Sequence, residues 1–282
     1  MSRVPALKSR QLQWQFGARV YVMGILNVTP DSFSDGGRFS TLDSAMKQAH
    51  LMIEAGVDLI DVGGESTRPG APEVDEAEEL RRVMPVLHEL HRAFPHVPVS
   101  IDTMKPGVAQ AALDSGVSMV NDVTGLQNPV MRAVVAKEKV AACVMHMQGT
   151  PRTMQQQPRY ADVVVDVTAE LSAAIEAAVA SGVAREQLLV DPGICFGKTP
   201  EHNWQLLQNL NALEPIGRPV VLGVSRKSFL GRLLGERSPE ERVTAGTTLA
   251  ALLAERGVID VIRTHDVQAM KDALAVAAAL KR

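Results

Sequence analysis

Polar or ionisable side chains stand at the ends of short apolar runs along this chain of 282 residues. They recur in seven of the eight runs that are typical of strands, at Asn27, Asp61, Asp102, Asn121 with Asp122, His146, Asp191, and Arg263 with His265. The remaining run, 219–225, leads into Ser225-Arg226-Lys227-Ser228. A single buried polar residue is usually a structural group with its hydrogen bonds satisfied, but packing alone does not explain such a repeat. We therefore predict one shared polar site.

The types of side chain indicate what this site could hold. Asp102 and Asp191, with Asn121 between them in the chain, suit a flat heterocycle that carries N–H groups, because a carboxylate accepts two parallel N–H bonds from a guanidine-like edge. Lys227 would donate to a carbonyl or a ring nitrogen of the same molecule. The carboxylates could instead hold a metal cluster by themselves. Their combination with amides and with Lys227 favours the heterocycle.

A second group of side chains suits an anion. Arg263 and His265 alternate by two on the last predicted strand, so we expect both to point the same way. Asn27 lies on the first predicted strand, which is adjacent to the last when a barrel closes. Together the three would form a phosphate pocket, with a hard cation such as Mg²⁺ on the amide oxygen and a diphosphate. The alternatives are an ion pair between Arg263 and a neighbouring carboxylate, and a structural role for the Asn27 amide.

The elements that must position these residues alternate between apolar, β-branched runs and alanine-rich helical stretches. Predicted strands span 20–28, 58–63, 97–103, 118–123, 140–147, 188–192, 219–225 and 259–265. Predicted helices span roughly 42–56, 75–93, 105–115, 129–138, 160–181, 201–210, 239–256 and 266–281. Eight strand–helix units with near-continuous apolar strands predict an α/β fold, a single (β/α)8 TIM barrel whose strand ends converge on one face. An open doubly wound sheet is the alternative, but no GxGxxG follows the first strand.

Domain organisation and composition are those expected of one globular unit. We assign 19–282 to the barrel and 1–18 to a short N-terminal extension, expected as a hairpin or a cap at the barrel bottom. The formal net charge is −3 and no cluster of Lys or Arg forms a stripe, so we expect neither nucleic acid nor membrane as a partner. Cys143 and Cys195 indicate reduced cysteines in a cytoplasmic protein. We see no signal peptide and no apolar run of about 18 residues.

The first predicted strand runs into an unusual loop, Thr29-Pro30-Asp31-Ser32-Phe33-Ser34-Asp35-Gly36-Gly37-Arg38. Pro30 ends the strand ladder, and Gly36-Gly37 provides a hinge. Phe33 is a bulky ring that nothing in its own segment covers. We predict a mobile flap that closes over a ligand. The alternative is an inert surface loop with Phe33 in a crevice.

Two long motifs resemble the signatures of the dihydropteroate synthase family. MGILNVTPDSFSDGG begins at Met23 and resembles the first, and LIDVGGESTRPG begins at Leu59 and resembles the second. The resemblance extends from about Val20 to the C-terminus. It implies a transferase of folate biosynthesis and a sulfonamide target. Such an enzyme condenses 6-hydroxymethyl-7,8-dihydropterin diphosphate with p-aminobenzoate, giving 7,8-dihydropteroate and diphosphate, with Mg²⁺ and by an SN1-like substitution.

The same resemblance implies roles for individual residues. Those for the pterin are Asp102, Asn121, Met145, Asp191, Phe196, Gly223, Lys227 and Arg263. Those for p-aminobenzoate are Phe33, Thr67, Arg68, Pro69 and Ser228. Those for diphosphate are Asn27, Arg263 and His265, and Asn27 is also the implied metal ligand. The implied catalytic set is Asn27, Asp102, Lys227, Arg263 and His265.

Two rival functions and the question of assembly stand beside this interpretation. A pterin-binding methyltransferase shares the barrel but differs in the two signature motifs that begin at Met23 and Leu59. A non-catalytic pterin-binding paralogue is disfavoured because four residues are intact, namely Asn27, Arg68, Lys227 and Arg263. Small residues in the helix at 239–256, including Gly246 and Ala250, favour a homodimer contact, as the resemblance does. Tight packing of that helix on its own barrel is the alternative.

Overall fold

The eight predicted strands form one closed parallel sheet. The computed structural model describes residues 4–29, 38–67 and 70–280. The sheet contains β3 (Tyr21–Asn27), β4 (Leu59–Gly63), β5 (Val99–Asp102), β6 (Met119–Asp122), β7 (Ala141–Met145), β8 (Leu188–Asp191), β9 (Val221–Gly223) and β10 (Val261–Thr264). Its strand order is β8-β7-β6-β5-β4-β3-β10-β9, and a bridge between Val190 and Val220 joins the two outer strands. The predicted TIM barrel is therefore confirmed.

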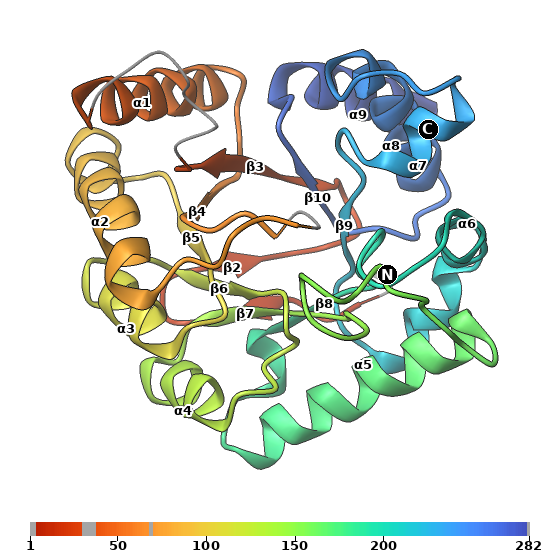
Figure 1. Cartoon of the computed structure of the whole chain (residues 1–282), viewed down its shortest axis with the longest axis horizontal. Coiled ribbons are helices and arrows are strands. Elements are labelled where there is room, and N and C mark those ends of the chain that lie inside the picture. The colour runs from red at the N-terminus through yellow and green to blue at the C-terminus, as the bar shows by residue number, and fades with distance from the viewer. Residues whose placement is uncertain (1–3, 30–37, 68–69, 281–282) are drawn as a thin grey trace.

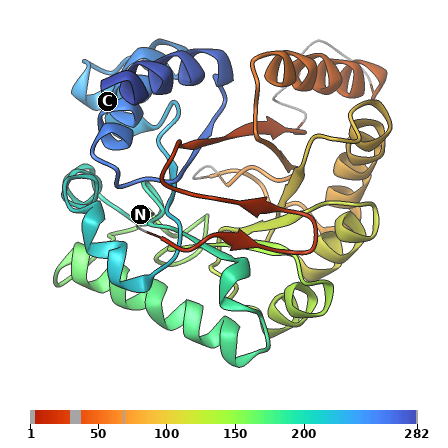
Figure 2. The ribbon, with the colours of Figure 1, turned by 180° about the vertical axis from the view of Figure 1, so that it is seen from behind.

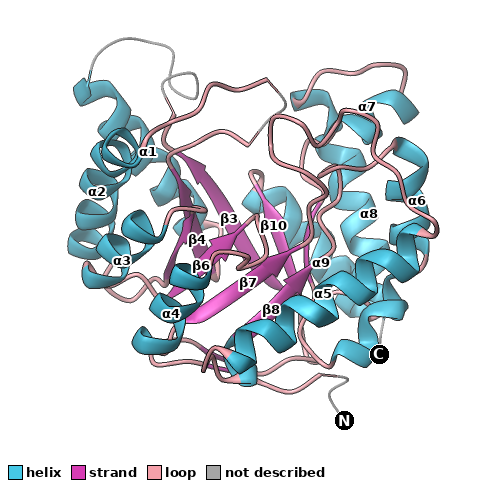
Figure 3. Ribbon diagram, turned by 60° about the horizontal axis from the view of Figure 1, so that its bottom comes forward, coloured by secondary structure: helices cyan, strands magenta, loops and turns pink. Residues whose placement is uncertain are grey.

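Helices surround this sheet, as Figures 1 and 3 show. They are α1 (Arg38–Glu54), α2 (Glu76–Ala93), α3 (Pro106–Asp114), α4 (Pro129–Glu138), α5 (Val163–Ala180), α6 (Pro200–Gln208), α7 (Ser228–Leu233), α8 (Val243–Glu255) and α9 (Val267–Leu280). Most lie within a few residues of the predicted ranges. The predicted helix at 239–256 is instead divided into a 3₁₀ turn, Glu240–Arg242, and α8. The short helix α7 was not predicted.

Local sequence sets several helix ends. The side chain of Asp75 caps α2 by accepting the backbone N–H of Glu78 at 2.8 Å. The Glu78 carboxylate pairs with Arg81 and Arg82 of the same helix. Gly56 follows α1 with a φ of +76°, a conformation that glycine adopts without the steric cost borne by other residues. Both helix boundaries therefore follow from the local sequence.

The N-terminal residues cover the end of the barrel from which the strands start. β1 (Leu7–Lys8) pairs antiparallel with β2 (Gln13–Trp14), and Figure 2 shows this segment crossing the barrel. Trp14 stacks on Tyr21 at the start of β3, with ring centroids 4.4 Å apart. Apolar residues of the N-terminal segment form one buried cluster with the barrel interior, including Met23 and Leu59. This end is filled and apolar, so the polar strand ends lie at the other.

The helix α8 packs against α9 on the outside of the barrel. Its small residues Gly246 and Ala250 are buried within the chain, while Leu252 on the same helix is 60% exposed. The two small residues thus pack within their own chain, whereas the side chain of Leu252 faces outward. No helix within the described ranges is long and apolar enough to cross a bilayer.

Candidate active site

Arg263 joins three strands at the mouth of the barrel. From β10, its Nε donates to Oδ2 of Asp61 on β4 and its Nη2 donates to Oδ2 of Asp102 on β5, each at 2.6 Å. Asp61 is fully buried, and it also accepts hydrogen bonds from Ser100 Oγ at 2.6 Å and Asn121 Nδ2 at 3.0 Å. The ion pair considered as an alternative for Arg263 is present. Asp61, predicted only as one of the polar strand ends, lies at its centre.

Burial and pairing oppose each other in this network. Burial alone would lower the pKa of Arg263, but Asp61 and Asp102 outweigh that effect and raise it. The guanidinium is therefore charged. Burial raises the pKa of Asp102 to about 7, although the charge of Arg263 pulls it down. Asp102 therefore depends on Arg263 for its charge at neutral pH, and loss of the cation would favour the neutral acid.

A second group of predicted residues lies around the loop that follows β8. Oδ1 of Asp191 accepts the backbone N–H of Gly193 at 2.7 Å. The Lys227 ammonium donates to the carbonyl of Ile194 and lies 5.0 Å from the centroid of the Phe196 ring. Burial raises the pKa of Asp191 and lowers that of Lys227, and their opposite charges limit both shifts. A buried acceptor therefore lies near a half-buried donor, and the donor lies beside an aromatic ring.

Apolar side chains and one glycine shape the space around Lys227. Met145 and Phe196 pack in one small cluster with Val123, Met147 and Met154. A Cβ atom at Gly223 would lie 3.6 Å from Nζ of Lys227, so glycine leaves room beside the ammonium. The structure therefore brings the predicted residues Met145, Phe196, Gly223 and Lys227 into one region next to Asp191.

His265 lies beyond the end of its strand, which corrects the predicted alternation with Arg263. β10 ends at Thr264. Nδ1 of His265 lies 3.1 Å from Oγ of Ser225, whereas Arg263 reaches across the mouth to β4 and β5. The strand period therefore does not extend to His265, because the chain has already left the sheet. Arg263 therefore pairs with β4 and β5, whereas His265 contacts the loop after β9.

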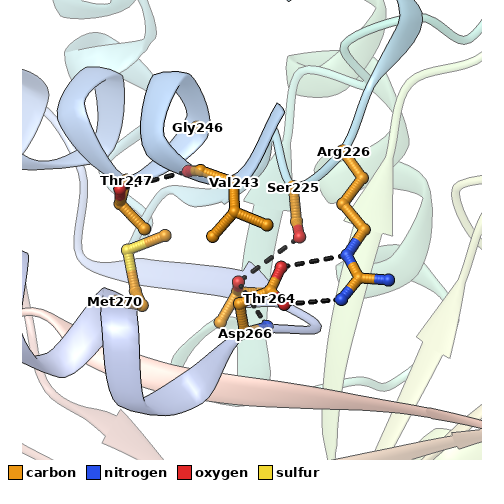
Figure 4. Close-up of a pocket in the computed structure, with 8 residues that line it drawn as sticks. All are labelled: Ser225, Arg226, Val243, Gly246, Thr247, Thr264, Asp266 and Met270. Carbon is orange, nitrogen blue, oxygen red and sulfur yellow. Dashed lines mark hydrogen bonds and ion pairs between the residues drawn. The ribbon is translucent and has the colours of Figure 1, made fainter. Parts of the chain in front are cut away.

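Ser225 lines a small hollow between the ends of β9 and β10 and the helices α8 and α9. Figure 4 shows Ser225 beside Thr264 and, next to them, the paired side chains of Arg226 and Asp266. Arg226 donates to Asp266 from Nε at 3.0 Å and from Nη2 at 2.5 Å. This bidentate pair fixes the start of α9 against the loop after β9, so it supports the place of His265.

Lys198 is buried beside the site, yet sequence reasoning did not single it out. It is 3% exposed, its Nζ lies 2.8 Å from Nδ1 of His146, and it donates to the carbonyl of Phe196 at 3.0 Å. Burial lowers the pKa of Lys198 to about 7. Burial and the charge of Lys198 lower the pKa of His146 to about 3, so the imidazole is neutral. The signal in the sequence that could have pointed to Lys198 is its place seven positions after the strand-end residue Asp191.

Some of the residues predicted to bind p-aminobenzoate lie within the described ranges and some do not. Phe33, Arg68 and Pro69 lie outside the described residues, as does most of the predicted first flap. Thr67 lines a small hollow whose wall also includes residue Asp102. Ser228, the fifth predicted residue, begins α7 and is exposed.

Asn27 ends β3 next to the end of β4. A Cβ atom at Gly63 would lie 3.8 Å from Oδ1 of Asn27 and 3.6 Å from Oδ2 of Asp102. The absence of a side chain at Gly63 therefore keeps open the space between the amide of Asn27 and the carboxylate of Asp102.

Comparison with known proteins decides the family. A model of the family described as "Pterin binding enzyme" matches residues 23–265. The dihydropteroate synthase of Synechocystis sp. is 44% identical over 279 residues, which are 99% of this chain and 96% of that protein. The chain belongs to the dihydropteroate synthase family. The predicted resemblance is thereby confirmed, and the pterin-binding methyltransferase alternative is wrong.

Solved dihydropteroate synthases have the same fold. The Yersinia pestis enzyme with a sulfonamide drug complex matches with a TM-score of 0.91 and 44% identity, over 98% of this chain and 99% of that chain. The Burkholderia cenocepacia enzyme complexed with 7,8-dihydropteroate matches with a TM-score of 0.88 and 42% identity, over 99% and 97%. Membership of the dihydropteroate synthase family confirms the predicted class of enzyme, a transferase.

Proposed function

We propose that the chain joins 6-hydroxymethyl-7,8-dihydropterin diphosphate to p-aminobenzoate, giving 7,8-dihydropteroate and diphosphate. The observation that carries the proposal is the buried ion-pair network of Arg263 with Asp61 and Asp102 at the mouth of a dihydropteroate synthase barrel. Carboxylates offer acceptors to the guanidine-like edge of a pterin. A guanidinium offers donors to a leaving anion. The acceptors for the pterin and the donors for the leaving anion therefore lie together at the mouth of the barrel.

We assign the pterin to the space between β5 and β8. Asp102, Asn121 and Asp191 are its proposed polar partners, and Lys227 is its proposed donor. Support comes from their surroundings, because Asn121 and Arg263 share the Asp61 carboxylate and Lys227 lies beside the Phe196 ring. The flat ring system would then take its polar contacts at its edge and its apolar contacts on its faces, with Met145 and Phe196 as walls.

The proposed reaction breaks the bond between the pterin methylene carbon and a diphosphate oxygen. A bond forms from the amine nitrogen of p-aminobenzoate to that carbon, and the nitrogen then loses one proton. Negative charge gathers on the departing oxygens, where we assign Arg263 and His265 as stabilising groups. Arg263 has five N–H donors, and its bonds to Asp61 and Asp102 use two of them. Asp102 and Asp191 would balance positive charge on the pterin, which favours a dissociative, SN1-like path.

Asn27 is our proposed ligand for Mg²⁺. Its amide oxygen is a hard donor at the barrel mouth, and Mg²⁺ commonly takes one or two protein oxygens together with water and substrate phosphates. When bound, the ion would neutralise charge on the diphosphate. Within the described ranges, no group of three or more His, Cys, Asp or Glu side chains could hold a metal ion. The alternative of a carboxylate metal cluster therefore has no site in that part of the chain.

The test is an assay of the purified chain with both substrates. We expect release of diphosphate and formation of 7,8-dihydropteroate, measured separately, each dependent on p-aminobenzoate and each lost when a chelator removes Mg²⁺ and restored by its addition. A non-catalytic pterin-binding relative would bind the pterin ester without releasing diphosphate. Absence of any product that depends on p-aminobenzoate would refute the proposal.

We also infer that two copies of the chain associate through α8. We infer separately that the protein is located in the cytoplasm. Leu252 on α8 and Val276 on the adjoining α9 are 60% and 64% exposed, which offers apolar surface beside the small residues of α8. Cys143 and Cys195 are both free thiols, as in reducing compartments. Sedimentation of the purified chain tests the association, and a monomer at all accessible concentrations would contradict it.

A further inference from the structure

A cation ties the loop after β4 to the helix that follows it. Nζ of Lys105 donates to Oε2 of Glu65 at 2.5 Å and to Oε2 of Glu79 at 2.6 Å. Glu65 stands two residues before Thr67, and Glu79 lies on α2 with its side chain 1% exposed. One ammonium therefore holds a carboxylate from each side of the loop at 64–75.

The other oxygen of Glu65 binds the far end of the same loop. Its Oε1 accepts the backbone N–H of Val74 at 3.2 Å. Lys105 is fixed from the barrel, since its backbone N–H donates to Oγ1 of Thr103 at 3.2 Å and the N–H of Thr103 donates to the carbonyl of Asn121 at 3.1 Å. Hydrogen bonds thus run without a break from β6 to both ends of the loop after β4.

We propose that Lys105 is the positioning residue for Thr67, and thereby for the subsite of the second substrate. Glu65, Thr67 and Glu79 line the same hollow as Asp102, so the position of the Glu65 carboxylate decides where Thr67 stands relative to the pterin-side carboxylate. Lys105 itself is not a lining residue and touches no proposed substrate group. The inference rests on the proposed function, because it assigns Lys105 to the reaction with p-aminobenzoate.

Charge makes this link sensitive to substitution. Burial lowers the pKa of Lys105, but its hydrogen bonds to Glu65 and Glu79 outweigh that effect and raise it, so the side chain is an ammonium ion at neutral pH. Oε1 of Glu79 is buried and has no hydrogen-bond partner among the described residues. Glu79 therefore depends on Lys105 for compensation. A neutral side chain at position 105 would leave two close carboxylates to repel each other, and Glu65 would move with Thr67.

The test compares Lys105→Met and Lys105→Arg with the full wild-type chain in steady-state kinetics. We expect Lys105→Met to raise KM for p-aminobenzoate about tenfold, with KM for the pterin diphosphate within about twofold of wild type, because small misplacements of a binding group carry costs of this order. Lys105→Arg keeps the charge and should recover part of the loss. The matched control is Arg218→Met. Arg218 is 1% exposed and donates to the carbonyl of Leu188 at the start of β8, remote from the mouth. It should lower the melting temperature without changing the ratio of the two KM values.

The ratio of the two KM values decides the matter. An equal rise of both values in Lys105→Met, or a ratio the same as in Arg218→Met, would overturn the assignment. If Lys105→Met does not fold, Lys105→Gln, which is polar but also lacks the charge, is measured in its place. A selective rise of KM for p-aminobenzoate supports the role, and an unchanged ratio refutes it. Failure of the wild-type chain to form any product would refute the proposed function, which separates the two conclusions.

Discussion

Oγ of Ser225 lies 3.1 Å from Nδ1 of His265 and also accepts the backbone N–H of His265 at 3.2 Å. The serine oxygen also accepts from Oγ1 of Thr264 at 3.4 Å, so both of its lone pairs are engaged and its own proton is available for Nδ1. That arrangement favours the tautomer of His265 that carries its proton on Nε2, the nitrogen that can then donate to an anion. A neutral hydroxyl thereby leaves Nε2 of His265 as the nitrogen that could donate to the proposed diphosphate.

Replacement of Ser225 by alanine should weaken the binding of diphosphate. A single hydrogen bond contributes about 0.5–1.5 kcal/mol, so we expect affinity for diphosphate with Mg²⁺, measured by titration calorimetry, to fall about three- to tenfold. Ser115→Ala is the control, since its hydroxyl bonds only the carbonyl of Ala112 at the end of α3. Equal affinities of wild type and Ser225→Ala would show that the serine does not orient His265.

Replacement of Arg263 by alanine should damage both catalysis and stability. Loss of a preorganised donor costs roughly 10²–10³-fold in rate, and we expect a fall of this order in kcat/KM. Asp61 and Asp102 would also remain buried without their cation, which costs on the order of 3–5 kcal/mol in the free energy of unfolding. Arg19→Ala, which breaks the pair between Arg19 and Asp58, controls for loss of an arginine. Normal turnover in folded Arg263→Ala would contradict the proposed role.

Two replacements of Asp191 separate its hydrogen bond to Gly193 from its proposed contact with the pterin. Asparagine keeps an oxygen for the backbone N–H of Gly193, whereas alanine leaves that buried donor without its acceptor. We expect both variants to lose pterin binding in calorimetry, because neither offers a carboxylate. Only Asp191→Ala should also lower the melting temperature. Retention of pterin affinity in Asp191→Asn would show that the charge of Asp191 does not hold the pterin.

Stability should rise with pH above neutrality because of Lys198. Burial lowers its pKa from the ordinary 10.5 to about 7, so between these values the unfolded chain binds more protons than the folded chain. Unfolding free energy from this residue then increases with pH across that window, by at most ~1.4 kcal/mol per pH unit. Below pH 7 the full penalty of burying the ammonium is present.

Urea unfolding at pH 7, 8 and 9 measures this dependence. We expect the difference between wild type and Lys198→Met to change with pH in the direction that favours wild type at high pH. Lys47→Met, at an exposed position of α1, is the control and should show no such trend. A difference that does not vary with pH would mean that Lys198 retains its charge in the folded state.

The strands could be predicted because their signal is local. Runs such as 58–63 and 118–123 are apolar and β-branched, and they must be buried on both faces wherever they lie. The polar residue that ends each run is equally visible, so Asp102, Asn121 and Asp191 could be found before any partner was known. By contrast, α7 is six residues long and contains Gly231, and its helical form depends on packing that the local sequence does not contain.

The partners of the polar residues could not be predicted in the same way. Asp61 lies at the centre of the mouth because closure of the barrel brings β10 within reach of β4, and no local pattern distinguishes Asp61 from the other strand-end carboxylates. Lys198 follows no strand period, so its inward direction is a property of the loop around Gly193. The predicted direction of His265 failed because the strand ends one residue earlier than expected.

Trp14 and Tyr21 close the end of the barrel from which the strands start. Small molecules must therefore reach and leave the strand ends through the opposite opening. Two substrates and two products would then enter and leave through the same opening. Diphosphate must leave past the incoming amine, and a retained dihydropteroate would block the next pterin. The release of products, rather than bond formation alone, is therefore expected to limit the turnover rate.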